Sequence, residues 1–236
     1  MPTILSLFDE SGIWSHPFVQ AGYDVYQFDL NTGFDIRDFS VGWFIENWNI
    51  TDVEGVLAAP PCTHFTCSGN QYWAAKDADG RTAAAVELVM QVIRVVQYFE
   101  PDWWVIENPQ GRLVKLITAY CGADILGKPW YFDPFEFAGY ADEEFNYRRM
   151  SEEPLKSFAS GFSTAQRLAF ATERYTKRTG LWGEFNIPHK LSLPPVQFCE
   201  QGSWLQMLGG KSERTKQLRS TTPTGFSQAF FEVNHG

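Results

Sequence analysis

Residues 81–109 read RTAAAVELVMQVIRVVQYFEPDWWVIENP, and this stretch decides the fold class. Its first part carries apolar residues at helical spacing, which predicts an amphipathic helix over 81–99. Its second part, WWVIENP at 103–109, is an apolar run ended by a proline, which predicts a buried strand. A helix that leads directly into a buried strand is typical of proteins built on a parallel sheet.

The same alternation of strands and helices extends back to the start of the sequence. Ser15 is predicted to cap the first helix, with Pro17 in its first turn. This order predicts an α/β fold with a doubly wound, mostly parallel sheet and helices on both faces. The predicted strands are TILSLF (3–8), DVYQFDL (24–30) and GVLAAP (55–60), and the predicted helices are SHPFVQAGY (15–23) and VGWFIENW (41–48).

The remainder of the chain is predicted to be less regular. The segment 139–175 reads as an insertion, in which 141–154 is charged and loop-like and 163–175 is a capped helix. A basic stretch at 209–220 and a closing helix at 223–233 follow. We therefore predict three parts: an α/β core (1–138), the insertion (139–175), and a C-terminal part (176–236) that returns a helix to the core.

Composition narrows the functional classes. The 236 residues are 44% hydrophobic, which is enough for a proper core, and no purely apolar run reaches the roughly 20 residues of a membrane span. Four cysteines and four histidines lack paired CxxC spacing, which argues against a zinc site or a disulfide framework and favours a reducing cytoplasm. The N-terminal segment has no basic region, so no signal peptide is expected.

The charge is unevenly distributed along the chain. Residues 1–110 hold 4 Lys/Arg against 15 Asp/Glu, whereas residues 111–236 hold 15 against 13. The overall charge of −9 argues against a general nucleic-acid binder. The asymmetry favours a polyanion contact confined to one face.

Polar side chains follow each predicted strand. Asp9 comes after the first strand, Asp29 ends the second, Asp35 lies in the next turn, Cys62 follows the prolines of the third, and Glu107 ends the fourth. Because the carboxyl ends of parallel strands meet at one edge of the sheet, these groups are expected to line a ligand crevice. An acid that ends the second strand is well placed to accept hydrogen bonds from ribose hydroxyls.

In order and spacing, these segments resemble the DNA cytosine-5 methyltransferase family. The Pro-Cys and Glu-Asn pair, on either side of one long helix, is the most specific part of the resemblance. The segments that carry it are LFDESG (7–12), FDL (28–30), FDI (34–36), PPCTHFTCSG (60–69), ADGRTAAAVELVMQVIRVVQYFEPDWWVIENPQGRL (78–113), YTKRTGLWG (175–183) and PTGFSQAFF (223–231).

The resemblance implies a Rossmann-like, S-adenosylmethionine-dependent methyltransferase fold and a set of site residues. Catalysis would rest on Cys62, Glu107 and Arg178, with no metal. The core (1–138) would bind the cofactor and carry catalysis, the insertion (139–175) would contact DNA, and the C-terminal part (176–236) would add the arginine motif, a basic DNA-facing segment and a cofactor helix. Residues that would bind the cofactor are Phe8, Asp9, Gly12, Asp29, Asp35, Ile36, Pro60 and Ser227. Residues that would contact the substrate DNA are Ser68, Arg81, Asn108, Lys177, Lys211 and Arg214.

The chemistry explains these residue types. A Cys62 thiolate that adds to carbon 6 of cytosine makes carbon 5 nucleophilic, and Glu107 would protonate or hydrogen-bond ring nitrogen 3. Arg178 can donate to the 2-carbonyl of the ring. Since a base inside duplex DNA is inaccessible, the target cytosine must be flipped out.

The sequence also departs from the family pattern. The first loop retains only Gly12, with Glu10 at a usual glycine position, and Pro109 replaces the usual valine. No segment is long enough for a large target-recognition domain, a feature that resembles short, virus-type members. Low sequence specificity is expected, with phosphate contacts carrying most of the binding. The predicted phosphate contacts are Arg148, Arg149, Lys190, Lys211, Arg214 and Lys216.

Three functions stay open at this point. The first is a DNA cytosine-5 methyltransferase that uses S-adenosylmethionine. The second transfers a modified group, such as carboxymethyl from carboxy-S-adenosylmethionine, because the basic stretch before the last helix could bind a donor carboxylate. The third is an RNA-directed enzyme or a non-catalytic DNA-binding relative. For the enzyme we expect a monomer with DNA as its partner, no membrane association, and a cytoplasmic location (the host cytoplasm if virus-encoded).

Overall fold

The chain folds into two compact units. The computed structural model describes residues 2–38, 50–209 and 212–236. Unit 1 comprises Met1–Tyr131 and Thr179–Phe185, and unit 2 comprises Phe132–Arg178 and Asn186–Gly236. The helix predicted at 41–48 lies outside the described residues. Whether 1–138, 139–175 and 176–236 divide the work as expected from the sequence stays a prediction.

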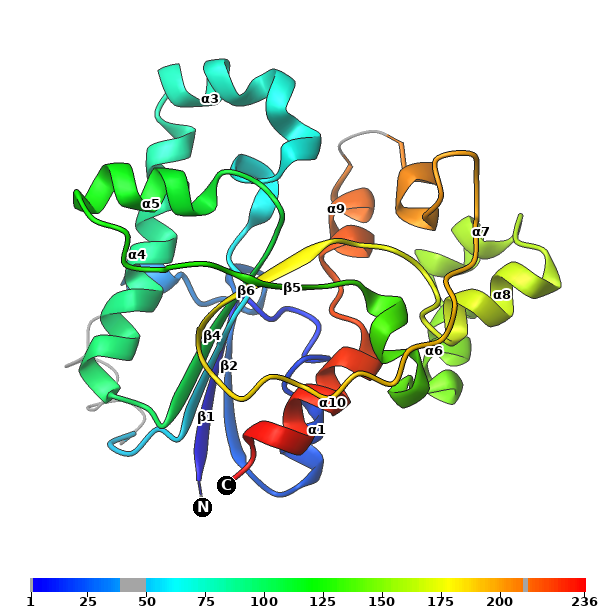
Figure 1. Cartoon of the computed structure of the whole chain (residues 1–236), viewed down its shortest axis with the longest axis horizontal. Coiled ribbons are helices and arrows are strands. Elements are labelled where there is room, and N and C mark those ends of the chain that lie inside the picture. The colour runs from blue at the N-terminus through cyan, green and yellow to red at the C-terminus, as the bar shows by residue number, and fades with distance from the viewer. Residues whose placement is uncertain (1, 39–49, 210–211) are drawn as a thin grey trace. The chain divides into compact units, whose positions relative to one another are not determined.

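Unit 1 is built on a six-stranded sheet (Figure 1). The strand order is β2-β1-β3-β4-β6-β5; the first four strands are parallel, and β6 runs antiparallel to β4. The predicted doubly wound, mostly parallel α/β fold is confirmed, and it is Rossmann-like. The strands are β1 (Thr3–Leu7), β2 (Asp24–Phe28), β3 (Gly55–Ala58), β4 (Trp103–Pro109), β5 (Trp130–Phe132) and β6 (Thr179–Glu184).

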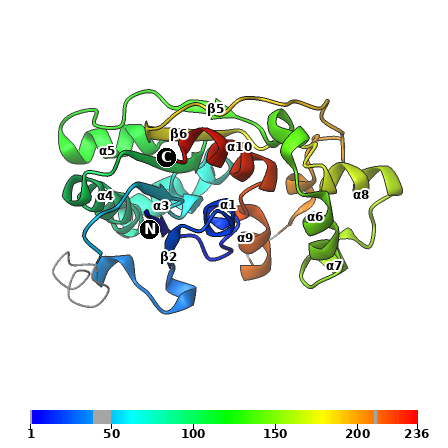
Figure 2. The same ribbon diagram turned by 90° about the horizontal axis from the view of Figure 1, so that it is seen from below.

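Helices cover both faces of this sheet, and the strand residues alternate between them. Leu5 and Leu7 belong to the core cluster that includes α4, whereas Phe18 of α1 stacks on Trp103 with ring centroids 5.5 Å apart. Figure 2 shows α1 and α4 on opposite sides of the strands. The helices of unit 1 are α1 (His16–Gln20), α3 (Trp73–Ala78), α4 (Arg81–Phe99) and α5 (Leu113–Cys121).

Helix α4 spans the residues predicted from its periodicity. It follows Gly80, whose φ of +84° suits glycine. Its 19 residues and a mean hydropathy of 1.2 over its best 18-residue window also make it long and apolar enough to cross a membrane by length and composition. Its buried side chains, Val89 and Val92 among them, pack in the core cluster, so it is the core helix of unit 1.

Unit 2 is mainly helical, with an aromatic core. The rings of Phe170 and Tyr175 both contact that of Trp204, with centroids 5.1 and 5.3 Å apart. A second aromatic group contains Phe132 and Phe226, stacked at 4.1 Å. The elements of unit 2 are the 3₁₀ segments η5 (Pro134–Tyr140) and η6 (Trp204–Met207) and the helices α6 (Glu143–Met150), α7 (Leu155–Ala159), α8 (Thr164–Ala171), α9 (Glu213–Ser220) and α10 (Thr224–Asn234).

The prediction of a loop over 141–154 is wrong, because helix α6 forms there. The Asp142 side chain caps it by accepting from the Phe145 amide at 2.9 Å. Acidic residues in the first turn and Arg148 and Arg149 in the last turn complement the helix dipole. A strongly polar segment can be helical when its charges are ordered in this way. The other two helices expected in unit 2, α8 and α10, are confirmed.

A buried carboxylate connects distant parts of unit 2. Glu173 is 3% exposed and accepts hydrogen bonds from the backbone amides of Thr224 at 2.6 Å and Gly225 at 2.8 Å. The Asn146 amide donates to it at 3.2 Å. Glu173 therefore supplies the acceptors that the N-terminus of α10 needs, since the first amides of a helix have no partner within it. Burial raises the pKa of Glu173 above its usual value.

Candidate active site

The strand order gives the unit 1 sheet a topological switch point. The direction in which successive strands are added reverses between β1 and β3, which are neighbours in the sheet. In open α/β sheets, ligands bind outside the carboxyl ends of the strands at such a switch point. The loops that follow β1 and β3 contain Asp9 and Cys62. These two loops are therefore the natural place for a site.

The segment after β3 turns sharply at Cys62. Two prolines precede the cysteine, which begins a 3₁₀ turn at Cys62–His64. Its carbonyl accepts from the amides of Phe65 and Thr66 at 2.9 and 3.0 Å. Phe65 is fully buried in the core cluster and the Cys62 thiol is half-buried. The chain thus holds the thiol on a short turn between two rigid prolines and a buried aromatic ring.

The end of β4 joins the turn at Cys62. Asn108 is fully buried and its side-chain amide donates to the Pro60 carbonyl at 2.9 Å. Its neighbour Glu107 is 8% exposed. This bond brings the Pro-Cys and Glu-Asn segments together, as expected for side chains on neighbouring parallel strands. The predicted DNA contact of Asn108 stays a prediction, and in this structure its amide bonds to the backbone.

The chain beyond β4 also pairs with the segment that follows Cys62. Thr66 and Gly111 form an isolated antiparallel bridge, and the Cys67 amide donates to the Gln110 carbonyl at 3.2 Å. A Cβ at Gly111 would lie 1.9 Å from the Phe65 carbonyl oxygen, so only glycine fits here. Gly111 is not among the residues predicted from the sequence; its one signal there is a glycine two residues after a strand-ending proline.

The loop after β1 is organised around the Asp9 carboxylate, which is 5% exposed. The hydroxyls of Ser6 and Ser15 donate to its Oδ2, both at 2.9 Å, and Ser11 donates to its Oδ1 at 3.3 Å. Ser15 precedes α1 as predicted, but the prediction that it caps the helix is wrong. Its hydroxyl makes no cap hydrogen bond and donates instead to Asp9 and to the Gly12 carbonyl.

Two further features fix the shape of this loop. Phe8 has a φ of +61° and its amide donates to the Phe28 carbonyl at 2.7 Å. Gly12 has a φ of +66°, and a Cβ there would meet the Gln27 side chain at 3.1 Å. Gln27 in turn donates to the Asp9 carbonyl. The single glycine of this loop therefore lies where the positive φ favours glycine and where the Gln27 side chain leaves little room for a Cβ.

The two acids after β2 have different hydrogen-bond partners. Asp29 begins a 3₁₀ turn at Leu30–Thr32, and its Oδ1 accepts from the Asn31 amide at 2.8 Å. Asp35 pairs with Arg37, which lowers the pKa of Asp35 below its usual value. Ile36 is 5% exposed and packs in the core cluster. The predicted adenine and ribose contacts of these residues stay predictions.

The remaining predicted catalytic and cofactor residues belong to unit 2. Arg178 pairs with Asp133 at 3.4 Å, and the Lys177 amide donates to the same carboxylate at 2.8 Å. Burial raises the pKa of Asp133. Ser227 is 1% exposed and its hydroxyl donates to the Pro223 carbonyl one turn earlier in α10.

The residues predicted to contact nucleic acid belong to several elements of the two units. In unit 1, Ser68 is exposed beside Thr66, and Arg81 is exposed at the start of α4, where it pairs with Asp79. Arg214 lies in α9, and Lys211 lies outside the described residues.

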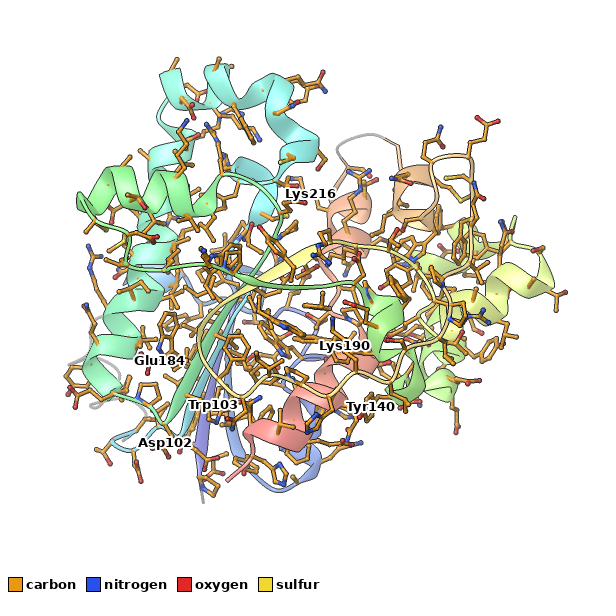
Figure 3. All side chains as sticks on the ribbon, viewed as in Figure 1. Asp102, Trp103, Tyr140, Glu184, Lys190 and Lys216 are labelled. Carbon is orange, nitrogen blue, oxygen red and sulfur yellow. The ribbon has the colours of Figure 1, made fainter. Side chains whose placement is uncertain are left out.

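The predicted phosphate contacts of unit 2 differ in their burial and in the partners that the structure gives them. Lys190 pairs with Glu136 at 2.7 Å, whereas Lys216 is exposed; Figure 3 shows the two lysines well apart. Arg149 is half-buried, donates to the Thr221 hydroxyl at 3.3 Å and lies over the Phe145 ring. Its partners make Arg149 a poor candidate for a phosphate contact. Within the described ranges, no cluster of three His, Cys, Asp or Glu side chains could hold a metal ion.

The known proteins that this chain resembles include two described as methyltransferases. Over 125 residues the chain is 30% identical to the type II methyltransferase M.DdeI of Desulfomicrobium norvegicum, a match that covers 47% of this chain and 28% of that protein. It also matches a solved structure described as a prophage-encoded DNA modification methyltransferase from E. coli, with a TM-score of 0.44 and 15% identity. That match covers 82% of this chain and 52% of the other. The chain therefore spans well under two-thirds of either relative, and no family model matches it.

Proposed function

We propose that this chain transfers a one-carbon group from an S-adenosylmethionine-type donor to carbon 5 of cytosine in DNA, through a covalent adduct with Cys62. The observation that carries the proposal is the hydrogen bond from the Asn108 amide to the Pro60 carbonyl. It joins the strand end that bears the nucleophile to the strand end that bears Glu107, so both can act on one base. The similarity to a type II methyltransferase supports a methyl donor.

The proposed chemistry gives each residue one role. The Cys62 thiolate forms a bond to carbon 6, and the electron pair moves onto the ring, so carbon 5 becomes nucleophilic. Glu107 protonates or hydrogen-bonds ring nitrogen 3 and stabilises the negative charge that develops. Arg178 donates to the 2-carbonyl, as the resemblance to the cytosine-5 family implies. Carbon 5 takes the one-carbon group as the donor's carbon–sulfur bond breaks. Water or another base then removes the carbon-5 proton, and elimination of the thiolate restores the aromatic ring.

The residues at the switch point fit the proposed cofactor. Asp29 is a half-buried carboxylate at the end of β2, one of whose oxygens is already oriented by the Asn31 amide. An acid in this place accepts hydrogen bonds from ribose hydroxyls. The cofactor supplies an electrophilic carbon on a sulfonium when bound. Phe8 and Gly12, both in left-handed conformations, shape the loop beside it.

Low sequence specificity belongs to the same proposal. A good bidentate base contact contributes about 1–3 kcal/mol of discrimination, and a short unit 2 can make few of them. Phosphate contacts carry no sequence information. We therefore propose a preference for one or two bases beside the target cytosine, and binding that weakens steeply with salt.

The proposal is tested by mass spectrometry of nucleosides from DNA incubated with the protein and S-adenosylmethionine. The expected product is 5-methylcytosine, absent from a parallel reaction with the Cys62→Ala variant. DNA that contains 5-fluorocytosine should form a stable adduct, because fluorine cannot leave carbon 5 as a proton does. Peptide mapping should place the adduct on Cys62. Modification at an exocyclic nitrogen, or no modification, would refute the proposal.

Parallel reactions separate the remaining alternatives. Carboxy-S-adenosylmethionine replaces the donor in one reaction, and RNA replaces DNA in another. A carboxymethylated base or a modified RNA would redirect the proposal to that donor or substrate. Arg219, from the basic stretch proposed to bind a donor carboxylate, instead donates to the Leu208 carbonyl at 2.6 Å. Arg219 is therefore a poor candidate for binding a donor carboxylate.

A further inference from the structure

The side chain of Arg112 lies at the centre of a contact cluster behind the Cys62 turn. Its two terminal nitrogens donate to the two carboxylate oxygens of Asp77, both at 2.7 Å, and one of them also donates to the Thr82 hydroxyl at 3.1 Å. The guanidinium carbon lies 4.4 Å from the centre of the Trp73 ring. The side chain is 11% exposed. This bidentate, stacked arrangement leaves the guanidinium little freedom.

The same residue donates twice to the segment that follows Cys62. Its Nε donates to the His64 carbonyl at 3.0 Å, and its backbone amide donates to the Phe65 carbonyl at 2.9 Å. His64 is the last residue of the turn that Cys62 begins. The turn is thus held before the thiol by Asn108, at Pro60, and after the thiol by Arg112.

Asp77 links this cluster to helix α3. The Arg112 guanidinium, followed by the Thr82 hydroxyl, lowers the pKa of Asp77 to about 2, so the carboxylate stays charged at neutral pH. In the same helix Lys76 donates to the Thr63 carbonyl, within the Cys62 turn. Three successive carbonyls, those of Thr63, His64 and Phe65, therefore accept from side-chain or backbone donors that lie outside the turn.

We propose that Arg112, oriented by Asp77 and Trp73, is a positioning residue that holds the His64 carbonyl and through it fixes the direction of the Cys62 thiol. The inference deepens the proposed function, on which it rests for its catalytic readout. A thiol that must approach one face of a cytosine ring needs a fixed turn, because a displacement of about 1 Å at a reacting group can cost about 100-fold in rate.

The geometry requires arginine at this position. A lysine carries one compact charge and cannot make a fork to Asp77 while a separate N–H reaches the His64 carbonyl. Arg112→Lys should therefore keep the charge but lose the hold on the turn. Asp77→Asn keeps the shape and loses the charged partner, so it should have a smaller effect. Arg94→Gln is the matched control, because Arg94 is an exposed arginine on the far part of α4 that bonds to Gln91.

The test measures turnover, donor affinity and thermal stability for these variants with DNA and S-adenosylmethionine. For Arg112→Lys we expect kcat to fall by about 100-fold, with the dissociation constant of the donor and the KM for DNA nearly unchanged. Asp77→Glu should recover part of the activity that Asp77→Asn loses. A split of this kind distinguishes positioning from general destabilisation. Wild-type kcat in Arg112→Lys, or equal losses in kcat and donor affinity, would overturn the proposal.

A second readout does not depend on the reaction. Alkylation of Cys62 by iodoacetamide, followed by peptide mass spectrometry, reports on the turn itself, with the exposed Cys121 as an internal reference. Freeing the turn should expose the half-buried thiol and raise its alkylation rate several-fold over that in the wild type and in Arg94→Gln. If the wild type transfers no group to nucleic acid, the proposed function fails, and this rate still decides the positioning role. An unchanged rate in Arg112→Lys would refute that role.

Discussion

The loops that follow β1 and β3 leave the same edge of the sheet but are held in opposite ways. The β1 loop is held mainly by nearby serine hydroxyls, which donate to the Asp9 carboxylate, with further hydrogen bonds between its backbone and Gln27 and Phe28 at the end of β2. The β3 loop is held from outside, by Asn108 and Arg112, which lie 48 residues away from the carbonyls they bind. The first loop thus depends mostly on residues close to it in the sequence, and it can shape a cofactor site. The second can be moved or fixed by the strand that carries Glu107, which suits a loop that bears a nucleophile.

The largest effect is expected from Cys62→Ala, which should change turnover but not donor binding. Cys62→Ala should lower kcat by at least about 1000-fold, because the covalent step has no substitute. Donor affinity, which depends on the β1 loop in this comparison, should stay within about twofold of the wild type. Turnover assays and calorimetric titration of the donor measure the two quantities. The exposed Cys67 provides the control: Cys67→Ala should be active, and an adduct on Cys67 would contradict the assignment.

The second prediction concerns the other loop, where Asp9→Ala removes the carboxylate at the centre of the β1 loop. Asp9→Ala leaves the buried Ser6 hydroxyl without its carboxylate acceptor and leaves Ser15 only its longer contact to the Gly12 carbonyl, and a buried group left unsatisfied costs about 1–3 kcal/mol. We expect weaker donor binding and a lower free energy of unfolding, while the 5-fluorocytosine adduct still forms at saturating donor. Asp9→Asn, which keeps one acceptor oxygen, should lie between the two. Loss of the adduct with donor affinity intact would reverse the roles given to the loops.

A substitution in the outer support of the β3 loop should act on stability and turnover together. Gly111→Ala places a Cβ 1.9 Å from the Phe65 carbonyl oxygen, which is backbone and cannot rotate away. Forced overpacking of this kind costs about 1–3 kcal/mol. Chemical denaturation should show that loss relative to Gly161→Ala, where a Cβ meets nothing within 4 Å. A Gly111→Ala variant with wild-type stability would mean that the pairing of Thr66 with Gly111 does not hold the loop.

A substitution at Asp29 tests whether the proposed cofactor site extends to β2. Asp29→Ala should weaken donor binding by about 1.5–3 kcal/mol, the usual contribution of a hydrogen bond to a charged group. Turnover at saturating donor should change little. Asp102→Asn is the control, because Asp102 is exposed at the opposite end of β4, next to Trp103 (Figure 3). Equal donor affinities in wild type and Asp29→Ala would remove Asp29 from the ribose site.

The smallest expected effect is a pH dependence that belongs to the β3 loop. Because the pKa of Asp77 is lowered from 3.8 to about 2, its ion pair with Arg112 stabilises the fold above about pH 4. That contribution should decline as the pH falls from about 4 through 2, because the carboxylate is protonated in both states only below the folded pKa. The free energy of unfolding of the wild type should therefore approach that of Asp77→Asn over this interval. A constant difference between the two proteins down to pH 2 would contradict the lowered pKa.

Local pattern predicted most of unit 1. Helix α4 and the strands β1, β2, β3 and β4 follow from apolar spacing and from the prolines that end the runs. Helix α6 was missed because its helix signals are charges and a cap, which a search for apolar periodicity does not weigh. The antiparallel pairing of β6 with β4 could not be predicted either, because no local feature of Thr179–Glu184 indicates which strand it pairs with.

The candidate site was predictable only in part, for a related reason. Topology places strand ends at one edge, so Asp9, Cys62 and Glu107 could be named from the sequence. The groups that orient them act over long separations: Arg112 and Asp77 are 35 residues apart. Their pairing depends on how α3 is placed relative to β4. The predicted cap at Ser15 failed because Asp9 competes for its hydroxyl, a contact that exists only once the β1 loop has closed.

The insertion of β6 between β4 and β5 has a consequence for how the chain is made. After β4 and β5 are synthesised, the chain leaves unit 1 and does not return until Thr179. At about 5–20 residues per second, β4 presents an unpaired edge to the cell for several seconds. An open, apolar strand edge is a template for pairing with another chain. During synthesis, β4 therefore has an unpaired edge until β6 has been made. Expression at lower temperature or with chaperones should raise the soluble yield.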